Sequence, residues 1–399
     1  MATLPQALPL AGIRVLDLST VLAAPVTATF LGDFGAEVVK GEEPGRGDFT
    51  RGAKAGARSP YWAQEARNKK SVTLDLRTGR GQDRRLVPHF DVVITNYRPP
   101  TLRSWGLDPD ALRALAPDTV LAYVTGYGLT GPYRDRGSFD RIASAFAGLT
   151  YVTGDADRSP VRSGYSTIDY MAAYLGAFSV VTALYHRDTA GGGGQVIDLA
   201  LYEAGFRASE DALTSYATTG RIRERMGNHN PQIVPASDFT TSDGRRVSIH
   251  AGTDALFRRL AILMGTPELA DAPEYATRAV RAENAHVLYT MIADWAATRT
   301  ADDLTKLLSE ADVPASPLMS IAADPHYRER GTLVTVEDPD FGELPMVAPL
   351  PRLSKTPGSI RPARGSPAHT RRGRTPARDA ACPRTDSGHP ARPGPRCTG

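Results

Sequence analysis

Cysteine is nearly absent from this chain. The two cysteines, Cys382 and Cys397, lie near the C-terminal end, so the rest of the chain offers no thiol nucleophile and needs no disulfide. Long hydrophobic runs are missing too, because none approaches the roughly 18 apolar residues of a membrane span. The first residues, MATLPQALPLAGIRVLDLS, lack the basic region and small-residue cleavage site of a secretory signal. We therefore expect a cytoplasmic protein with no membrane segment.

Several catalytic motifs are also missing. No G-x-G-x-x-G follows the first expected strand, and neither G-x-x-x-x-G-K-S/T nor G-x-S-x-G occurs. These absences argue against a dinucleotide fingerprint, a phosphate loop and a serine-hydrolase elbow. The histidines before the tail show no zinc-binding spacing, and we predict no metal site; they are His89, His186, His229, His250, His286 and His326.

The last part of the chain differs in composition from the rest. From Arg361 onward there are nine arginines against Asp379 and Asp386, and no Val, Leu, Ile, Phe, Met, Tyr or Trp follows Ile360. Such a segment cannot pack a core. No aromatic residue interleaves the arginines, which disfavours a nucleic-acid arm. We predict that residues 361–399 form a basic tail that is disordered or aberrant, and we expect no nucleic-acid partner.

What remains has the composition of an ordinary globular protein, with 41% hydrophobic and 23% charged residues in a 399-residue chain. Its first part alternates between apolar strand patterns and helical patterns. Strands are expected at 13–18, 36–40, 71–76, 91–96 and 119–128, and helices at 25–34, 79–87 and 109–116. This alternation predicts an α/β fold with a doubly wound, parallel, Rossmann-like sheet, whose ligands bind beyond the carboxyl ends of the strands.

A second, smaller α+β domain is expected after the first. Two short strands flank Asp243 and Gly244, a hairpin signal, and helical patterns follow at 254–264, 276–297 and 301–311. We predict that residues 1–220 form the first part of the large domain and residues 221–325 the small domain. Residues 326–360 are then expected to return and complete the large domain.

One carboxylate, Asp169, stands at the start of a long apolar stretch that includes Phe178 and Val181. The pattern predicts a buried helix, and it leaves two interpretations open. Asp169 or Thr167 caps the helix by accepting hydrogen bonds from its first N–H groups, or Asp169 is a nucleophile that the positive helix end keeps ionised. Asp140, which also precedes a helical pattern, leaves the same choice between a cap and a functional group.

Successive blocks of the chain resemble the class III CoA-transferases, the CaiB/BaiF family. Among them are IRVLDLSTVLAAPVTATFLGDFGAEVVK, NKKSVTLDLRTGRG, DVVITNYRPPTLRSWGLD and IDYMAAYLGAFSVVTALYHRDTAGGGGQVIDLALYEA. The resemblance implies an enzyme that moves CoA from an acyl-CoA to a carboxylic acid, with the CoA thioester as substrate and no permanently bound cofactor. It also implies an interlocked homodimer.

The resemblance assigns roles to individual residues. It implies that Asp169 is the nucleophile, which forms a mixed anhydride and then an aspartyl-CoA thioester, and that Asp140 lies beside the acyl group. By the same match, CoA contacts are expected at Val21, Leu22, Ala23, Leu74, Arg77, Asn96 and Tyr97.

Two alternative functions stay open at this point. The family also contains α-methylacyl-CoA racemases, which need a histidine immediately before Asp140, where this chain has Phe139. A non-catalytic CoA-binding protein on the same fold is the other alternative. Among the transferases, the sequence most resembles members that use succinyl-CoA as donor and small dicarboxylates as acceptors.

Overall fold

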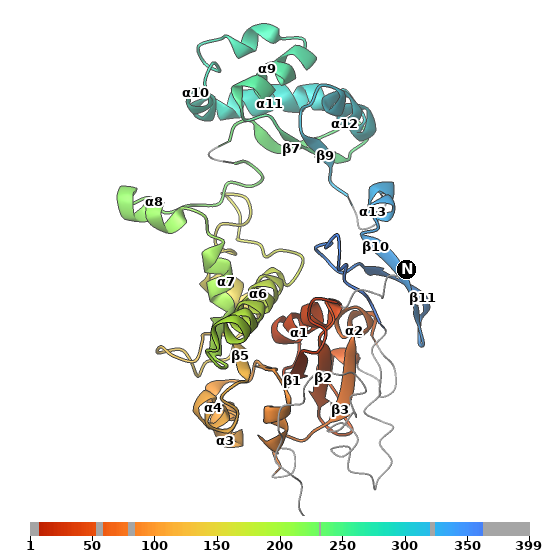
Figure 1. Ribbon diagram of the computed structural model, residues 1–399. Helices are drawn as coiled ribbons and strands as arrows, with labels where there is room; N and C mark the ends of the chain where they lie inside the picture. Colours follow the sequence, from red (N-terminus) through yellow and green to blue (C-terminus); the bar gives the residue numbers. More distant parts are fainter. Residues whose placement is uncertain (1–7, 53–58, 79–83, 231–232, 320–323, 362–399) are drawn as a thin grey trace, which may run out of the picture. The chain divides into compact units, whose positions relative to one another are not determined.

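The computed structural model describes residues 8–52, 59–78, 84–230, 233–319 and 324–361 (Figure 1). These residues form two compact units. The first contains the chain up to residue 143, residues 166–204 and the chain from residue 331, and the second contains residues 144–165 and 205–330. The expected boundaries were 220 and 325, whereas the chain enters the second unit at residue 205 and leaves it after residue 330. Residues 144–165, expected in the large domain, also pack with the second unit.

A six-stranded sheet forms the centre of the first unit. Its strands are β1 (Arg14–Asp17), β2 (Glu37–Glu42), β3 (Lys69–Thr73), β4 (Val92–Thr95), β5 (Val120–Thr125) and β6 (Val196–Ala200). They lie in the order β3-β2-β1-β4-β5-β6, and all neighbours are parallel. The predicted doubly wound parallel sheet is thus confirmed, with the order of strands reversing between β1 and β4.

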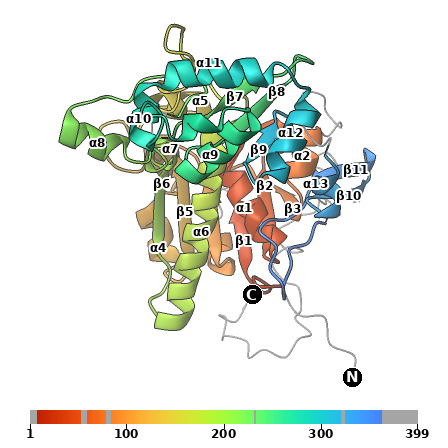
Figure 2. The ribbon, with the colours of Figure 1, turned by 90° about the horizontal axis from the view of Figure 1, so that it is seen from above.

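Helices cover both faces of this sheet. The helices α1 (Ala23–Asp33) and α6 (Thr167–Ala190) pack on one face and lie side by side (Figure 2). Gly176 permits their close approach, since a Cβ there would lie 2.7 Å from the Thr27 hydroxyl. On the other face, Leu16, Val93 and Leu121 pack in one cluster with the 3-10 helix η2 (Arg84–His89), α3 (Pro99–Trp105) and α4 (Pro109–Leu115). The central strands β1, β4 and β5 are therefore buried on both faces, which explains their continuous apolar runs.

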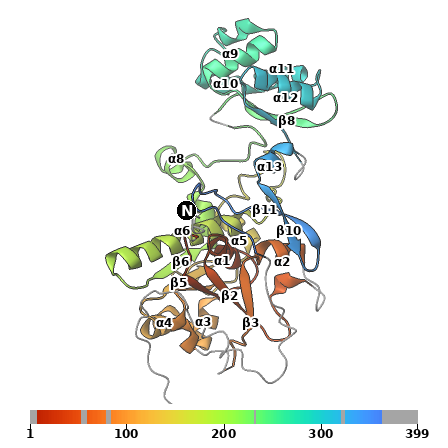
Figure 3. The same ribbon diagram turned by 45° about the vertical axis from the view of Figure 1, so that its right-hand side comes forward.

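The remaining elements of the first unit are short. They are η1 (Phe49–Arg51), α2 (Pro60–Glu65) and the antiparallel hairpin β10 (Leu333–Asp338) and β11 (Gly342–Val347) (Figure 3). The helices α5 (Asp140–Phe146) and α7 (Leu201–Arg207) run from the first unit into the second. Of the helix expected at 79–87, the described part is the 3-10 helix η2. The tail from residue 362 onward lies outside the described residues.

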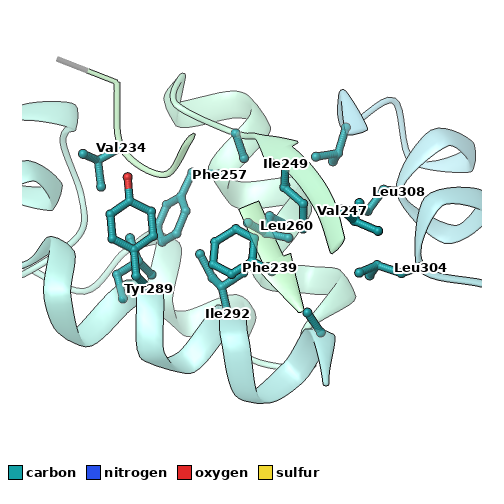
Figure 4. Close-up of a cluster of buried hydrophobic side chains, with 14 of the residues drawn as sticks. Val234, Phe239, Val247, Ile249, Phe257, Leu260, Tyr289, Ile292, Leu304 and Leu308 are labelled. Carbon is teal, nitrogen blue, oxygen red and sulfur yellow. The ribbon is translucent and has the colours of Figure 1, made fainter. Parts of the chain in front are cut away.

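The second unit is built on a three-stranded antiparallel sheet. Its strands are β7 (Ala236–Thr240), β8 (Arg246–His250) and β9 (Ala315–Pro317), and the predicted hairpin joins the first two. Helices complete the unit: α8 (Ala212–Thr219), α9 (Asp254–Leu263), η3 (Pro267–Ala270), α10 (Arg278–Glu283), α11 (Ala285–Ala296), α12 (Ala301–Glu310) and α13 (Pro325–Glu329). Apolar side chains from the sheet and from α9, α11 and α12 form one core, which includes Phe239, Ile249, Leu260, Ile292 and Leu304 (Figure 4).

The long helix α6 is only half buried, which corrects the expectation of a buried helix. Ala172, Ala173 and Val180 are buried, but Phe178 is 70% exposed and Val181 is 43% exposed. The sequence could not show this because apolar residues occur on every side of the helix. By length and composition alone α6 could cross a membrane, although 44% of its most apolar window is buried inside the protein.

Candidate active site

A pocket of about 530 Å³ lies at the carboxyl end of the parallel sheet. It is lined by Thr20–Ala23 after β1, by Asn96–Arg98 after β4, by Gly126 after β5 and by Leu201 after β6. Because β1 and β4 are adjacent at the point where the strand order reverses, this is where a doubly wound sheet binds its ligands. Asp169 also lines this pocket.

Two helices begin at the pocket. The first is the 11-residue helix α1. Leu22 is its N-cap and makes no side-chain capping hydrogen bond, and Leu22 and Ala23 both line the pocket, so the positive end of α1 lies at the pocket. The second helix is α6, which carries Asp169 in its first turn. Helix N-termini favour negative charge, and the pocket therefore suits an anionic group or an oxyanion.

Asp140, and not Asp169, supplies the side chain that caps the start of α6. One carboxylate oxygen of Asp140 accepts hydrogen bonds from the backbone N–H of Ile168 at 2.9 Å and of Asp169 at 3.4 Å. The N-cap residue itself, Ser166, makes no side-chain capping bond. The capping interpretation of Asp169 was therefore wrong, because a carboxylate from another helix takes that role. The Asp169 side chain is left available for chemistry.

The environment of Asp169 changes its proton affinity. Its side chain is buried, with 8% of the residue exposed. Burial, and then the negative charge of Asp140, raise the pKa of Asp169 to about 7. In the nucleophile interpretation, the positive helix end was expected to keep this carboxylate ionised, but desolvation outweighs that effect here. A carboxylate with such a pKa is more basic than usual, and so a stronger nucleophile once it is ionised.

With this geometry established, comparison with known proteins identifies the family. The chain matches CoA-transferase family III over residues 10–371. It is 43% identical over 360 residues to the succinyl-CoA–D-citramalate CoA-transferase of Chloroflexus aurantiacus, covering 88% of this chain and 89% of that protein. The chain belongs to the family III CoA-transferases.

Further relatives agree with this assignment. The human succinyl-CoA:glutarate CoA-transferase is 32% identical, with 87% of this chain and 81% of that protein covered. Among solved structures, a CaiB/BaiF family protein from Brucella suis is 31% identical with a TM-score of 0.78, covering 90% of this chain and 97% of that chain. A Mycobacterium tuberculosis protein is 28% identical with a TM-score of 0.77, covering 88% of this chain and 94% of that chain. This CoA-transferase therefore shares both the sequence and the fold of its family.

The structure brings together most of the CoA-contact residues that the sequence suggested. Val21, Leu22, Ala23, Asn96 and Tyr97 all line the pocket that contains Asp169. Tyr97 is held in place by an edge-to-face contact with Trp105, with ring centroids 4.7 Å apart. These residues come from two separate strand ends, which only the parallel pairing of β1 and β4 places side by side.

Leu74 and Arg77 do not line this pocket. Leu74 packs with the apolar cluster under α3 and α4, and Arg77 is exposed and pairs with Asp75 at 2.9 Å and Glu43 at 2.7 Å. They follow β3, which is the edge strand of the sheet and is separated from β4 by β2 and β1. Their assignment to CoA therefore stays a prediction from the family resemblance.

Two arginines outside the expected CoA contacts also line the pocket. Arg98 directly follows Tyr97, and Arg136 lies on the loop before Asp140. Arg98 donates to the backbone carbonyl of Asp135 at 3.4 Å, and Arg136 stacks on the Tyr133 ring at 3.7 Å. Within the described ranges neither has a carboxylate partner. Arg98 belongs to the strand end that the sequence marks as a ligand edge, whereas only the tertiary structure brings Arg136 to the pocket.

The lining of the pocket also bears on the racemase alternative. Phe139 lines the pocket at the position where a racemase would need a histidine, and the lining residues of the described chain include no histidine. A two-base proton abstraction therefore lacks its second base. The described residues likewise contain no cluster of three or more His, Cys, Asp or Glu that could hold a metal ion.

The pKa of Asp169 predicts how activity depends on pH. A carboxylate attacks a thioester only when it is ionised. If Asp169 is the nucleophile, kcat/KM for acyl-CoA should therefore rise with pH through a midpoint near 7 and level off above it. Asp140→Asn removes a negative neighbour but keeps an oxygen to accept from Ile168, so the midpoint should move to lower pH. Rates measured from about pH 5 to 9 on both proteins with one substrate check this. A flat wild-type profile, or the same midpoint in both proteins, would contradict it.

Proposed function

We propose that Asp169 is the covalent nucleophile of this enzyme and that CoA is moved from succinyl-CoA to a small dicarboxylic acid. The observation that carries the proposal is the placement of Asp169. It is a buried carboxylate with a pKa raised to about 7, in a pocket at the reversal point of the sheet and at the start of two helices.

The chemistry follows from a carboxylate acting on a thioester. An ionised Asp169 oxygen attacks the thioester carbonyl, the C–S bond breaks, and a mixed anhydride and CoA thiolate result. The thiolate attacks the aspartyl carbonyl of the anhydride, which releases succinate and leaves an aspartyl-CoA thioester. The acceptor carboxylate then attacks this thioester, the C–S bond breaks, and a second mixed anhydride and CoA thiolate form. The thiolate attacks the acceptor carbonyl of this anhydride, which gives the new acyl-CoA and frees Asp169. Each step exchanges one acyl bond for another, so ATP is not required.

The donor and the acceptor class are inferred from the relatives and from the charges in the pocket. The relatives are described as succinyl-CoA-dependent transferases for D-citramalate, L-malate and glutarate, and all three acceptors are dicarboxylates. Arg98 and Arg136 bring positive charge to the pocket, which suits the anionic phosphates and carboxylates of such substrates.

A panel of acids tests this substrate assignment. The protein is incubated with succinyl-CoA and, separately, with citramalate, malate, glutarate or the monocarboxylates butyrate and hexanoate, and new thioesters are detected by mass. We expect transfer to at least one dicarboxylate and little to the monocarboxylates. Transfer to monocarboxylates alone would contradict the proposed acceptor class while leaving CoA transfer itself intact.

We also propose that the enzyme works as a cytoplasmic homodimer. An apolar stripe on α6 supports it: Tyr174, Phe178, Val181 and Tyr185 recur at helical spacing and are all exposed in the single chain. Large exposed apolar patches mark interaction sites, and the family resemblance implies a second copy as the partner. An active monomer in sedimentation experiments would refute this.

A further inference from the structure

The loop that follows β1 contains a strained residue. Val21 has a φ of 71°, in the left-handed region. Four described non-glycine residues have positive φ, and of these only Val21 is β-branched; the others are Asn68, Glu210 and Asp312. A β-branched residue in this region is a true outlier. It persists only where the surrounding structure imposes the conformation, and such residues cluster at functional sites.

Hydrogen bonds to β1, to β2 and to the end of β4 fix the residues before Val21. The Ser19 backbone N–H donates to Asp17 at 3.0 Å, and the buried Lys40 ammonium donates to the Ser19 carbonyl at 2.5 Å. The next residue, Thr20, is held by Asn96: its N–H donates to the Asn96 Oδ1 at 3.0 Å, and the Asn96 Nδ2 donates to its carbonyl at 2.6 Å. Both backbone polar groups of Thr20 are therefore bound by a single side chain.

Buried charged groups hold the Lys40 ammonium in place, and with it the hydrogen bond to the Ser19 carbonyl. Lys40 lies 3.6 Å from Asp17 and 3.2 Å from Asp48, and Lys69 lies 2.9 Å from Asp17. Burial alone would raise the pKa of Asp17, but Lys40 and Lys69 together hold it below its usual value. These buried contacts hold the end of β1 at Ser19 in one position. The two hydrogen bonds of Asn96 then determine the direction in which the chain leaves Thr20.

We propose that Asn96 is a positioning residue for acyl-CoA binding, which acts by holding Val21 in its left-handed conformation. Thr20, Val21, Leu22 and Ala23 line the pocket, so their path sets its shape next to Asp169. Asn96 also lines the pocket, but one donor and one acceptor of its amide are already bound to Thr20. The inference rests on the proposed binding of acyl-CoA in this pocket.

The strain at Val21 makes the proposal testable by a double-mutant cycle. Without the Asn96 hydrogen bonds, valine should leave the left-handed region and distort the loop. Glycine occupies that region about as readily as the right-handed one. Val21→Gly should therefore make the loop less dependent on Asn96, even though the mutation leaves the Asn96–Thr20 hydrogen bonds in place.

The experiment measures KM and kcat for succinyl-CoA in wild type, Asn96→Ala, Val21→Gly and the double variant. In the wild-type background, Asn96→Ala should raise KM by about tenfold, the effect of losing one or two hydrogen bonds. In the Val21→Gly background the same mutation should raise KM by only about threefold or less, because glycine adopts the left-handed conformation at little cost. A crystal structure of Asn96→Ala should show Val21 outside the left-handed region.

Other results would overturn the proposal in distinguishable ways. An equal or larger rise in KM in the Val21→Gly background would mean that Asn96 binds the substrate directly. No rise in KM in either background would mean that acyl-CoA does not use this pocket. If Asn96→Ala does not fold, Asn96→Leu provides the same comparison, because leucine is neutral, is similar in size and makes neither hydrogen bond to Thr20.

A matched control comes from the second unit. The side-chain amide of Asn284 likewise makes two hydrogen bonds to the backbone, donating to the carbonyls of Glu274 and Val280, each at 3.1 Å. Asn284→Ala removes comparable hydrogen bonds without changing the β1 loop. KM for succinyl-CoA should stay at the wild-type value in this variant, and a rise equal to that of Asn96→Ala would contradict the specific role of Asn96.

Discussion

Replacing Asp169 with asparagine is expected to lower CoA transfer by about 10⁴-fold or more, because an amide cannot attack the thioester and form an anhydride. The amide is nearly the same size as the carboxylate, and the cap of α6 comes from Asp140, so the fold should be retained. Thioester exchange followed by mass measures the loss. Asp188→Asn, which changes an exposed carboxylate at the other end of α6, should keep wild-type activity.

A covalent label provides independent evidence for the same residue. Hydroxylamine attacks aspartyl anhydrides and thioesters, so wild-type enzyme given succinyl-CoA should lose activity and carry a hydroxamate at Asp169. Without acyl-CoA the enzyme should not be modified. A label that maps to another residue, or near wild-type transfer by Asp169→Asn, would refute the nucleophile assignment.

The same substitution should also change stability in a pH-dependent way. The folded-state pKa of Asp169 lies near 7, above its ordinary value of 3.8, so ionisation of this carboxylate destabilises the folded state. The penalty is absent below about pH 4 and grows as pH rises toward 7. At about pH 8, Asp169→Asn should therefore be more stable than wild type by on the order of 1.4 kcal/mol per unit of pKa shift. Urea unfolding at about pH 4 and pH 8 tests this, with no difference expected at the lower pH.

Removing Arg281 is expected to cause the largest loss of stability in the second unit. Its side chain is fully buried, and it donates to the carbonyls of Val234, Tyr275 and Gly252 at 2.9–3.1 Å and to Asp254 at 2.7 Å. Arg281→Ala would leave three carbonyls without these donors and open a cavity beside Phe257. Because each unsatisfied buried group costs about 1–3 kcal/mol, we expect a loss of about 3–5 kcal/mol.

The neighbouring helix offers a matched control for this prediction. Arg258 of α9 also pairs with an aspartate, Asp271, at 2.6 Å, but both side chains are more than half exposed. An exposed pair contributes at most about 1 kcal/mol, so Arg258→Ala should change the free energy of unfolding little. Urea unfolding followed by fluorescence compares the two variants. Equal losses in both would show that burial of Arg281 does not carry the expected stabilisation.

The architecture of the first unit could be predicted from the sequence because its signals are local. Strands such as Val92–Thr95 and Val120–Thr125 are buried on both faces and therefore read as continuous apolar runs. The helical segments between them then imply parallel pairing. Short helices such as α3 and α7 were missed, because seven residues give too few turns for a clear periodicity.

Exposure along α6 shows where local signals fail. The spacing of Phe178, Val181 and Leu184 suggested burial of all three, yet only Leu184 is buried. Hydrophobicity measures the tendency of a side chain to leave water, but it does not specify which surface of the protein will bury that side chain. The single chain covers one side of α6 with α1, while Phe178 and Val181 on another side stay exposed.

The sequence by itself determined the alternating α/β fold, the family resemblance and the placement of Asp169 ahead of a long helix, because these depend on residue type and spacing along the chain. Only the tertiary structure decided that Asp140, 28 residues before Ile168, caps that helix, and that Asn96 binds the backbone of Thr20, 76 residues away. The raised pKa of Asp169 was also settled only there. Desolvation and charge–charge interaction depend on distances in space, which the order of residues in the chain does not specify.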